Sequence, residues 1–340
     1  MPETHEGPIL GVDVGGTKLA VGHVVGREVV ASVQHPTPLT SSDDLIAALE
    51  AAVDEVTAES GRPIAIGIGI PSQIDFATGR VISSVNIPLA GIDLRHELTD
   101  HFGVPVVVDN DANCAALAEA QFVSDPPASE LVALTLGTGV GGGVIIGGRI
   151  FRGHTGLGAE LGHVVIQADG PECPGTCPNR GCLEALCSGT ALGRDARELA
   201  RARPESRLGR ALEKQGDVDG RDVVVFAREG DPDSIELLER LGTWLGVGIA
   251  NMVNIFEPEF VVVGGGLCAA ADLFIGVAEK EARSRALPAL AERVTIEIAT
   301  AGPAAGMIGA GLLATHILEQ PEPQKAKRDT ADLIANRGVQ

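Results

Sequence analysis

The stretch that decides the fold is residues 9–33, ILGVDVGGTKLAVGHVVGREVVASV. Its apolar runs, Ile9–Val14, Leu19–Val25 and Glu28–Val33, are separated by glycine turns, which is the pattern of three short strands joined by tight hairpins. The same pattern returns at residues 130–151, ELVALTLGTGVGGGVIIGGRIF. Because one device opens both halves of the chain, we predict a duplicated α/β architecture with two lobes around a cleft, where a ligand is expected to bind.

The segments that follow each of these stretches alternate between helical and strand patterns. In the first half we expect helices at 41–60, 93–102 and 112–122, and strands at 63–70 and 104–108. A linker pattern, SDPPAS, occupies residues 124–129. In the second half we expect helices within 189–255, at 269–285 and at 306–318, and strands at 260–263 and 294–299.

Composition excludes several classes of protein. The chain has 340 residues and a formal net charge of -20, which opposes binding to nucleic acid or to an anionic membrane surface. The first eight residues, MPETHEGP, lack the basic and apolar regions of a secretory signal. The most apolar helical stretch, Leu241–Phe256, is shorter than the ~20 apolar residues that a membrane span requires. We therefore expect a cytoplasmic protein.

Two glycine turns are candidates for phosphate binding. In Asp13–Lys18, DVGGTK, glycines would let backbone N–H groups approach a phosphate, while Lys18 adds a positive charge. A plain hairpin turn explains this segment about as well. The second turn, Leu136–Gly143, contains a formal GxGxxG, but a strand follows it rather than the helix that a dinucleotide site requires. Its equivalence to the first turn favours two turns that hold a phosphate chain from both sides.

Two further segments carry candidate chemistry. Residues 261–269, VVVGGGLCA, match GxGxxA between a strand and a helix, but no acidic residue follows at the spacing of a dehydrogenase. A glycine turn beside adenosine is an equally good interpretation. Residues 109–113, DNDAN, follow a strand, so one of these side chains is expected to cap the next helix. Alternatively, one carboxylate projects into the cleft as a general base.

Four of the six cysteines lie in one Pro/Gly-rich stretch, residues 169–188. A disulfide, a metal site and a catalytic thiol are all possible for such a cluster. A reducing compartment favours metal over disulfide. His163 with Cys173, Cys177 and Cys182 falls within the set of ligands that structural zinc uses.

Taken in order, these motifs resemble the ROK family of sugar kinases and repressors, within the actin-like/hexokinase ATPase superfamily. The resemblance runs from Ile9 to Leu318 and includes DVGGTK, DNDAN, LGTGVGGG, the E-x-G-H of Glu160 to His163 and the G-C-L-E of Gly181 to Glu184. It implies an α/β fold of the actin-like, ribonuclease H-like type. It also implies a small lobe of residues 1–118 plus about 303–318, a large lobe of 119–302 with a zinc-binding insertion at about 155–190, and a flexible tail at 319–340.

The resemblance also implies a site for an ATP-dependent hexokinase, most similar to a bacterial glucokinase. Asp111 would be the catalytic base that accepts the proton of the sugar 6-hydroxyl. The residues implied to contact the sugar are Asn86, Asn110, Asp111, Glu160, His163 and Glu184. Those implied to contact the nucleotide are Asp13, Gly15, Gly16, Thr17, Lys18, Gly137, Thr138, Gly139, Gly264, Gly265 and Gly266. Mg²⁺ would offset the charge of the phosphates.

Structural zinc is implied at His163, Cys173, Cys177 and Cys182. The family pattern is C-x-C-G-x-x-G-C, whereas here two residues are inserted after Cys173, so Cys173 is the least secure ligand. Cys187 is interpreted as a buried free thiol. The resemblance suggests a homodimer or homotetramer. It leaves open which hexose is preferred, whether ATP, ADP or polyphosphate is the donor, and whether the chain is instead a sugar-responsive regulator. For a regulator, however, Asp13 leaves no room for a preceding helix-turn-helix.

Overall fold

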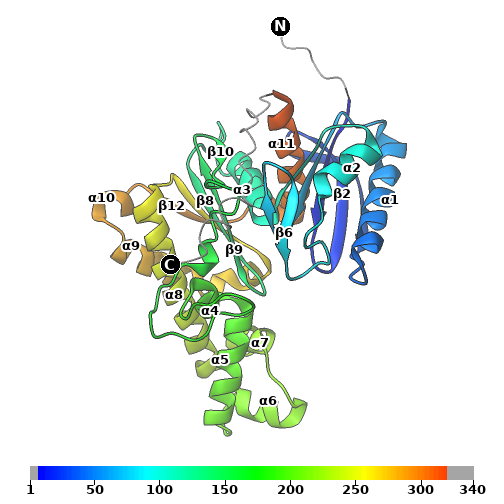
Figure 1. Cartoon of the computed structure of the whole chain (residues 1–340). Coiled ribbons are helices and arrows are strands. Elements are labelled where there is room, and N and C mark those ends of the chain that lie inside the picture. Colours follow the sequence, from blue (N-terminus) through cyan, green and yellow to red (C-terminus); the bar gives the residue numbers. More distant parts are fainter. Residues whose placement is uncertain (1–6, 320–340) are drawn as a thin grey trace, which may run out of the picture.

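The computed structural model describes residues 7–319, which form two α/β lobes, each built on one five-stranded sheet (Figure 1). In the first lobe the strand order is β3-β2-β1-β4-β7. The strands of this sheet are β1 Ile9–Val14, β2 Lys18–Val25, β3 Glu28–Pro36, β4 Ala65–Ile70 and β7 Val106–Asn110. The first three pair antiparallel, while β1, β4 and β7 run parallel.

The second lobe repeats this topology with the strand order β10-β9-β8-β11-β12. Its strands are β8 Leu131–Leu136, β9 Val140–Ile146, β10 Arg149–Ile150, β11 Phe260–Gly264 and β12 Thr295–Ile298. Again the hairpin strands pair antiparallel, and β8, β11 and β12 run parallel. The two stretches that open the halves of the sequence therefore occupy equivalent places, as the duplication predicted.

The helices of the first lobe follow the predicted pattern closely. α1 (Ser42–Ser60) and α2 (Leu94–Phe102) lie on the outer face of the first sheet (Figure 1). The apolar stripe of α1, which includes Leu45, Leu49 and Val53, is fully buried against that sheet. A small hairpin of β5 (Ser72–Asp75) and β6 (Arg80–Ser84) extends from the end of β4.

The second lobe carries the remaining helices. Four short segments precede the central helix: α4 Leu183–Cys187, α5 Gly189–Ala202, α6 Arg207–Gln215 and α7 Gly220–Arg228. The α5–α7 group projects away from the sheets at the bottom of Figure 1. The long helix α8 (Pro232–Phe256) packs against α9 (Ile275–Arg285), and α10 (Pro288–Ala291) follows. Within residues 7–319, no helix is both long and apolar enough to cross a membrane.

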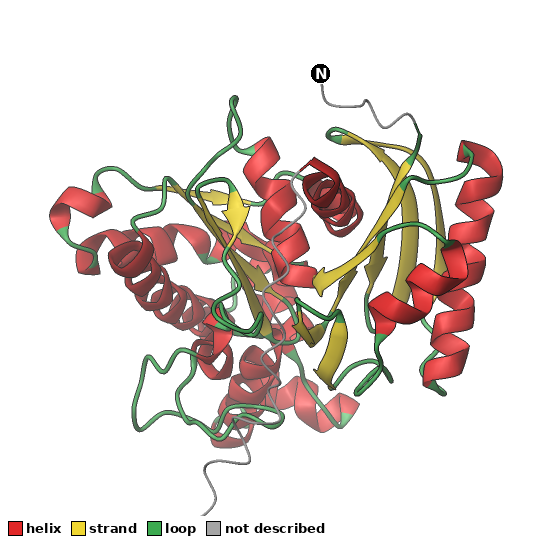
Figure 2. Ribbon diagram, turned by 45° about the horizontal axis from the view of Figure 1, so that its top comes forward, coloured by secondary structure: helices red, strands yellow, loops and turns green. Residues whose placement is uncertain are grey.

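Two helices, α3 (Asp111–Phe122) and α11 (Ala305–Glu319), lie between the two sheets and pack against each other (Figure 2). Their crossing depends on glycine. A β-carbon at Gly309 would lie 1.7 Å from the carbonyl oxygen of Cys114, so no larger residue fits there. Gly11 and Gly67 bring β1 and β4 equally close to the backbone of α11. The helix that begins with Asp111 is therefore fixed by backbone contact.

The structure differs from the sequence prediction at one helix. In place of a continuous helix at 269–285, a 3₁₀ segment covers Gly266–Leu273, and α9 starts only at Ile275. The break is at Phe274, whose backbone leaves the helical region (φ -138°) while its side chain is buried in the core of the second lobe. Burial of this large ring therefore overrides the local helical pattern. The tail was predicted at 319–340; Glu319 is instead the last residue of α11, and residues 320–340 lie outside the described residues.

Candidate active site

Asp111 begins α3 directly after the end of β7. Asn110 caps this helix: its side-chain oxygen accepts the N–H of Ala112 at 2.9 Å, and its amide donates to the carbonyl of Ser72 at 3.3 Å. The carboxylate of Asp111 lines a partly open cavity between the lobes. The cavity wall also includes Asn110, Glu160 and the backbone of Gly141 and Gly142 from β9. A carboxyl group thus lines a hollow to which both lobes contribute, a common place for a ligand to bind.

The electrostatics of the cavity suit a general base. Burial, together with the nearby carboxylates of Asp13 and Glu160, raises the pKa of Asp111 to about 6, although backbone N–H groups that donate to its carboxylate oppose the rise. Because β1 and β7 both run parallel to β4, Asp13 and Asp111 lie at the same edge of the sheet. A carboxylate with this pKa is ionised at neutral pH and still accepts a proton readily.

Asp109, the first carboxylate of the DNDAN segment, has a different task. It is 2% exposed, and its Oδ2 accepts Nε of Arg152 at 2.7 Å. Its Oδ1 accepts the N–H of Asn110 and the side-chain amide of Asn113. The structure thus separates the roles that the sequence left open: Asp109 is structural, Asn110 caps α3, and Asp111 faces the cavity.

Glu160 reaches the same cavity from the second lobe. Its Oε1 accepts the side-chain amide of Gln73 at 3.2 Å, and Gln73 in turn accepts the hydroxyl of Ser83. These contacts tie Glu160 to the β5–β6 hairpin of the first lobe. Glu160 and Asp111, which are 49 residues apart in the sequence, are therefore brought to one cavity.

The first glycine turn closes tightly at the end of β1. The N–H of Gly15 donates to the carbonyl of Lys18 at 2.7 Å, and the Thr37 hydroxyl donates to the carbonyl of Gly15. Burial raises the pKa of Asp13, an effect that the positive charge of Lys18 opposes. Asn86 lies beside Gly16 and is exposed, so it adjoins this turn and does not line the Asp111 cavity.

The second glycine turn is bound to the insertion that follows it. The N–H of Gly189 and the hydroxyl of Thr190, at the start of α5, donate to the carbonyls of Gly137 and Thr138. The carboxylate of Glu184 accepts the N–H of Val140 at 2.8 Å. Glu184 therefore contacts this turn, and it is not part of the Asp111 cavity wall.

The third glycine segment follows β11. Gly265 has a positive φ of 91°, and a β-carbon there would lie 2.4 Å from the carbonyl oxygen of Leu136. Gly264 and Gly265 line a second, partly open cavity, together with Ala299 and Gly302. The end of β11 is thus packed directly against β8, the strand that leads into the second turn. Gly266, the next residue, is exposed to solvent.

A candidate metal centre forms within the insertion. The ligand atoms of His163, Cys173, Cys177 and Cys182 all lie within 4.8 Å of one another. Nδ1 of His163 is 3.4 Å from Sγ of Cys173, and the sulfurs of Cys177 and Cys182 are 3.9 Å apart. A tetrahedron of thiolates around zinc has edges of ~3.8 Å. The insertion after Cys173 is therefore accommodated by the loop, and the donor set fits a structural metal ion.

The structure explains the remaining cysteine predictions. Cys187 is fully buried, as expected of a structural thiol, and burial raises its pKa well above the ordinary range. Cys182 precedes α4 directly, so the metal centre and Glu184 lie within one turn of chain. His163 ends a short 3₁₀ segment, Leu161–His163, and is half-buried beside the metal centre.

Several residues of the site were not identified from the sequence. These residues lie in segments whose sequence indicates only a loop or the end of a strand; they are Gln73, Phe76 and Arg152. The one signal they carried is an isolated charge or ring between small residues, and such a signal is common on any surface. Gln73 contacts Glu160, while Arg152 contacts both Asp109 and Phe76, and all of these contacts depend on how the two lobes meet.

The comparisons with known proteins agree with this geometry. The model of the ROK family matches residues 9–317. The glucokinase of Streptomyces coelicolor is 36% identical over 326 residues, which cover 93% of this chain and 99% of that protein.

Two solved structures resemble the whole fold. The ROK hexokinase from Thermus thermophilus has a TM-score of 0.78 at 34% identity, with 92% of this chain and 99% of that chain covered. A ROK family glucokinase from Streptomyces griseus, solved in complex with glucose and AMPPNP, has a TM-score of 0.76 at 33% identity, with 91% and 100% covered. The duplicated sheets, the paired glycine turns and these matches together show that the chain belongs to the ROK family and has its actin-like ATPase fold.

Proposed function

We propose that this protein is an ATP-dependent hexokinase that phosphorylates the 6-hydroxyl of glucose. The observation that carries the proposal is the placement of Asp111, whose pKa is raised to about 6, at the wall of a cavity between the lobes. The relatives that resemble the chain over nearly its full length include a glucokinase and a structure with glucose and AMPPNP.

In this mechanism Asp111 accepts the proton of the 6-hydroxyl as that oxygen attacks the γ-phosphorus of ATP. Asn110 and Glu160 hold sugar hydroxyls, since an amide and a carboxylate recognise a polyol through hydrogen bonds. His163 and Glu184 complete the sugar site when the lobes close, and Asn86 joins it from the side of the first turn. Closure would also exclude water from the phosphoryl transfer.

The nucleotide would lie between the two glycine turns. Because the N–H groups of Gly15 and Gly137 are used within their own turns, those of Gly16 and Thr17 would approach the phosphates from one side and those of Thr138 and Gly139 from the other. Lys18 adds a positive charge, and the segment 264–266 would face adenosine. Mg²⁺, when bound, offsets the charge of the phosphates. The carboxylate of Asp13, in β1 directly before this turn, is an oxygen ligand of the kind that Mg²⁺ prefers.

Zinc is the metal that the His/Cys₃ donor set suits best. When bound, it would hold His163, Cys173, Cys177 and Cys182 together and fix the start of α4. We also infer a cytoplasmic homodimer or homotetramer. The compartment is supported by the six cysteines, all of which are free thiols in the structure.

A coupled assay of the purified protein against a panel of sugars and donors tests the proposal. The panel would hold glucose, mannose, fructose, N-acetylglucosamine and N-acetylmannosamine, each with ATP, ADP or polyphosphate. We expect the highest kcat/KM with glucose and ATP. A preference for another hexose would correct the substrate and leave the chemistry intact. Sequence-specific DNA binding without sugar phosphorylation would instead identify a regulator.

A further inference from the structure

A buried ion pair joins the two lobes beside the active site. Oδ2 of Asp109, at the end of β7 in the first lobe, lies 2.7 Å from Nε of Arg152, which follows β10 in the second lobe. Their side chains are only 3% and 13% exposed. Two charges so far removed from water persist only when each is paired and hydrogen-bonded.

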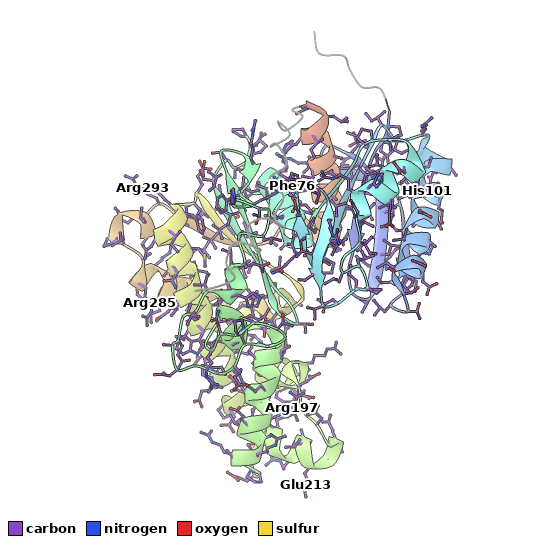
Figure 3. All side chains as sticks on the ribbon, in the orientation of Figure 1. Phe76, His101, Arg197, Glu213, Arg285 and Arg293 are labelled. Atoms are coloured by element: carbon purple, nitrogen blue, oxygen red, sulfur yellow. The ribbon has the colours of Figure 1, made fainter. Side chains whose placement is uncertain are left out.

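The same arginine also stacks on an aromatic ring of the first lobe. The guanidinium carbon of Arg152 lies 3.6 Å from the ring centroid of Phe76, in the turn between β5 and β6. Arg95 of α2 holds that turn through hydrogen bonds to the carbonyls of Phe76 and Ala77. Figure 3 shows Phe76 between the two lobes. Arg152 thus makes a charged contact and a stacking contact with the opposite lobe.

The chain after Arg152 continues to follow the first lobe. At Gly156, whose φ is 98°, a β-carbon would lie 2.8 Å from the backbone nitrogen of Phe76, so the two backbones are in close contact. At the end of the segment, Glu160 accepts the amide of Gln73 at 3.2 Å. Residues 152–160 therefore contact the β5–β6 hairpin at three successive places.

We propose that Arg152 and Asp109 are positioning residues that fasten the segment 152–160 to the first lobe, so that Glu160 and Asp111 are held as one preassembled half of the sugar site. The part of this inference that concerns sugar binding rests on the proposed function. Asp109 also accepts the N–H of Asn110 at 2.7 Å, so the ion pair acts directly on the turn that presents Asp111. The other half of the site, near Glu184, stays with the second lobe.

The pair also keeps charge balanced near the catalytic base. Removal of Arg152 alone would leave the carboxylate of Asp109 buried and uncompensated within two residues of Asp111. An added negative charge favours the protonated form of a neighbouring carboxyl group. Removal of both charges together would restore the balance while still releasing the segment 152–160.

Steady-state kinetics of four variants test the proposal: Arg152→Gln, Asp109→Asn, their combination, and Arg152→Lys. For Arg152→Gln and for Asp109→Asn we expect KM for glucose to rise about tenfold or more, the effect of losing a hydrogen bond to a charged group, with little change in KM for ATP. In the double variant, the loss of affinity for glucose should be smaller than the sum of the losses in the two single variants, expressed as free energies. Arg152→Lys, which keeps the charge, should recover part of the affinity.

The pH profile separates positioning from a general loss of structure. In Arg152→Gln the acidic limb of kcat should move to higher pH, and in the double variant it should return to the wild-type position. The matched control is Arg197→Gln, which breaks an exposed pair with Asp217 on the projecting helices, where Figure 3 labels Arg197. If Arg152→Gln has the same KM values and pH profile as this control, the proposal is wrong.

Hydrogen exchange of the ligand-free protein tests the attachment without any activity. We expect faster exchange in residues 152–160 of Arg152→Gln, with unchanged exchange in β1 and β4 of the first sheet. Equal exchange in the variant and the wild type would overturn the attachment. If the wild type phosphorylates no sugar, the proposed function fails, while this measurement still decides whether the ion pair holds the segment.

Discussion

Glu184 accepts the backbone N–H of Val140 at 2.8 Å, and its other carboxylate oxygen lies 3.9 Å from the sulfur of Cys173. One side chain therefore lies between the second glycine turn and the candidate metal centre. Cys182, one of the candidate metal ligands, is only two residues before Glu184, so a metal ion bound there would restrain the chain from which this carboxylate reaches the turn.

The first prediction follows from this contact. Glu184→Ala would remove the acceptor for Val140 and free the second turn, so KM should rise for ATP as well as for glucose, by about tenfold each. Steady-state kinetics with each substrate varied measure both constants. The control is Glu172→Ala, an exposed carboxylate of the same loop, which should leave both unchanged. A rise in the KM for glucose alone would mean that Glu184 contacts sugar only.

The second prediction concerns the catalytic base. Asp111→Asn keeps the size of the side chain but cannot accept the proton, so kcat should fall by about 10²–10⁴-fold. Calorimetric titration should still detect glucose binding, since the amide retains a hydrogen-bonding group. Asp100→Asn, at an exposed site on α2, serves as the control and should be fully active. A near-normal kcat in Asp111→Asn would exclude the assigned role.

The third prediction concerns pH and catalysis. Because the pKa of Asp111 is raised to about 6, kcat should fall as the pH drops below about 6, where the base becomes protonated. The rate should be level between about pH 7 and 8. A pH series at saturating substrate measures this limb. An acidic limb near pH 4 would show that the base has an ordinary carboxyl pKa.

The fourth prediction concerns the effect of the Asp111 carboxyl group on the stability of the fold. The pKa of Asp111 is about 6 in the folded protein and 3.8 for an ordinary aspartate, so the folded state binds one proton more than the unfolded state between these pH values. Ionised Asp111 therefore lowers the free energy of unfolding above pH 6, by up to about 3 kcal/mol. Asp111→Asn should be more stable than the wild type at pH 7.5, and this gain should vanish below about pH 4. Urea denaturation across that range measures it.

The fifth prediction concerns the metal centre. Elemental analysis of the purified protein should find one zinc per chain, and Cys173→Ser should lower this content after dialysis against a chelator, because one of four ligands is weakened. Cys268→Ser, which lies outside the cluster, should keep full occupancy. Equal zinc retention in Cys173→Ser and the wild type would mean that Cys173 is not a ligand.

Much of the fold followed from the sequence because its strands are short apolar runs with glycine turns between them. The strands β1, β8 and β9 occur at the predicted residues or within one position of them. The 3₁₀ segment at Gly266–Leu273 was not predicted, because it depends on the burial of Phe274 in a core assembled from distant helices. Local patterns carry no information about such packing.

The candidate site was predicted in part for the same reason. DNDAN contains three polar residues that could each cap a helix or face a cleft, and only the fold assigns Asp109 to Arg152 and leaves Asp111 in the cavity. The four candidate metal ligands could be named because they lie within 20 positions in the sequence. Contacts across the lobes, such as Gln73 with Glu160, depend on the meeting of segments 87 residues apart.

The crossing of α3 and α11 also sets a limit for protein engineering. At Gly309, Gly11 and Gly67 the atoms that exclude a β-carbon belong to the backbone, so neighbouring side chains cannot make room by changing rotamer. A library that seeks new sugar specificity should therefore leave this layer unchanged and vary exposed side chains of the β5–β6 hairpin. It should also keep Glu160 and Gly156, since a β-carbon at Gly156 would meet the backbone of Phe76. Substrate preference could then be altered without disturbing the helix crossing behind Asp111.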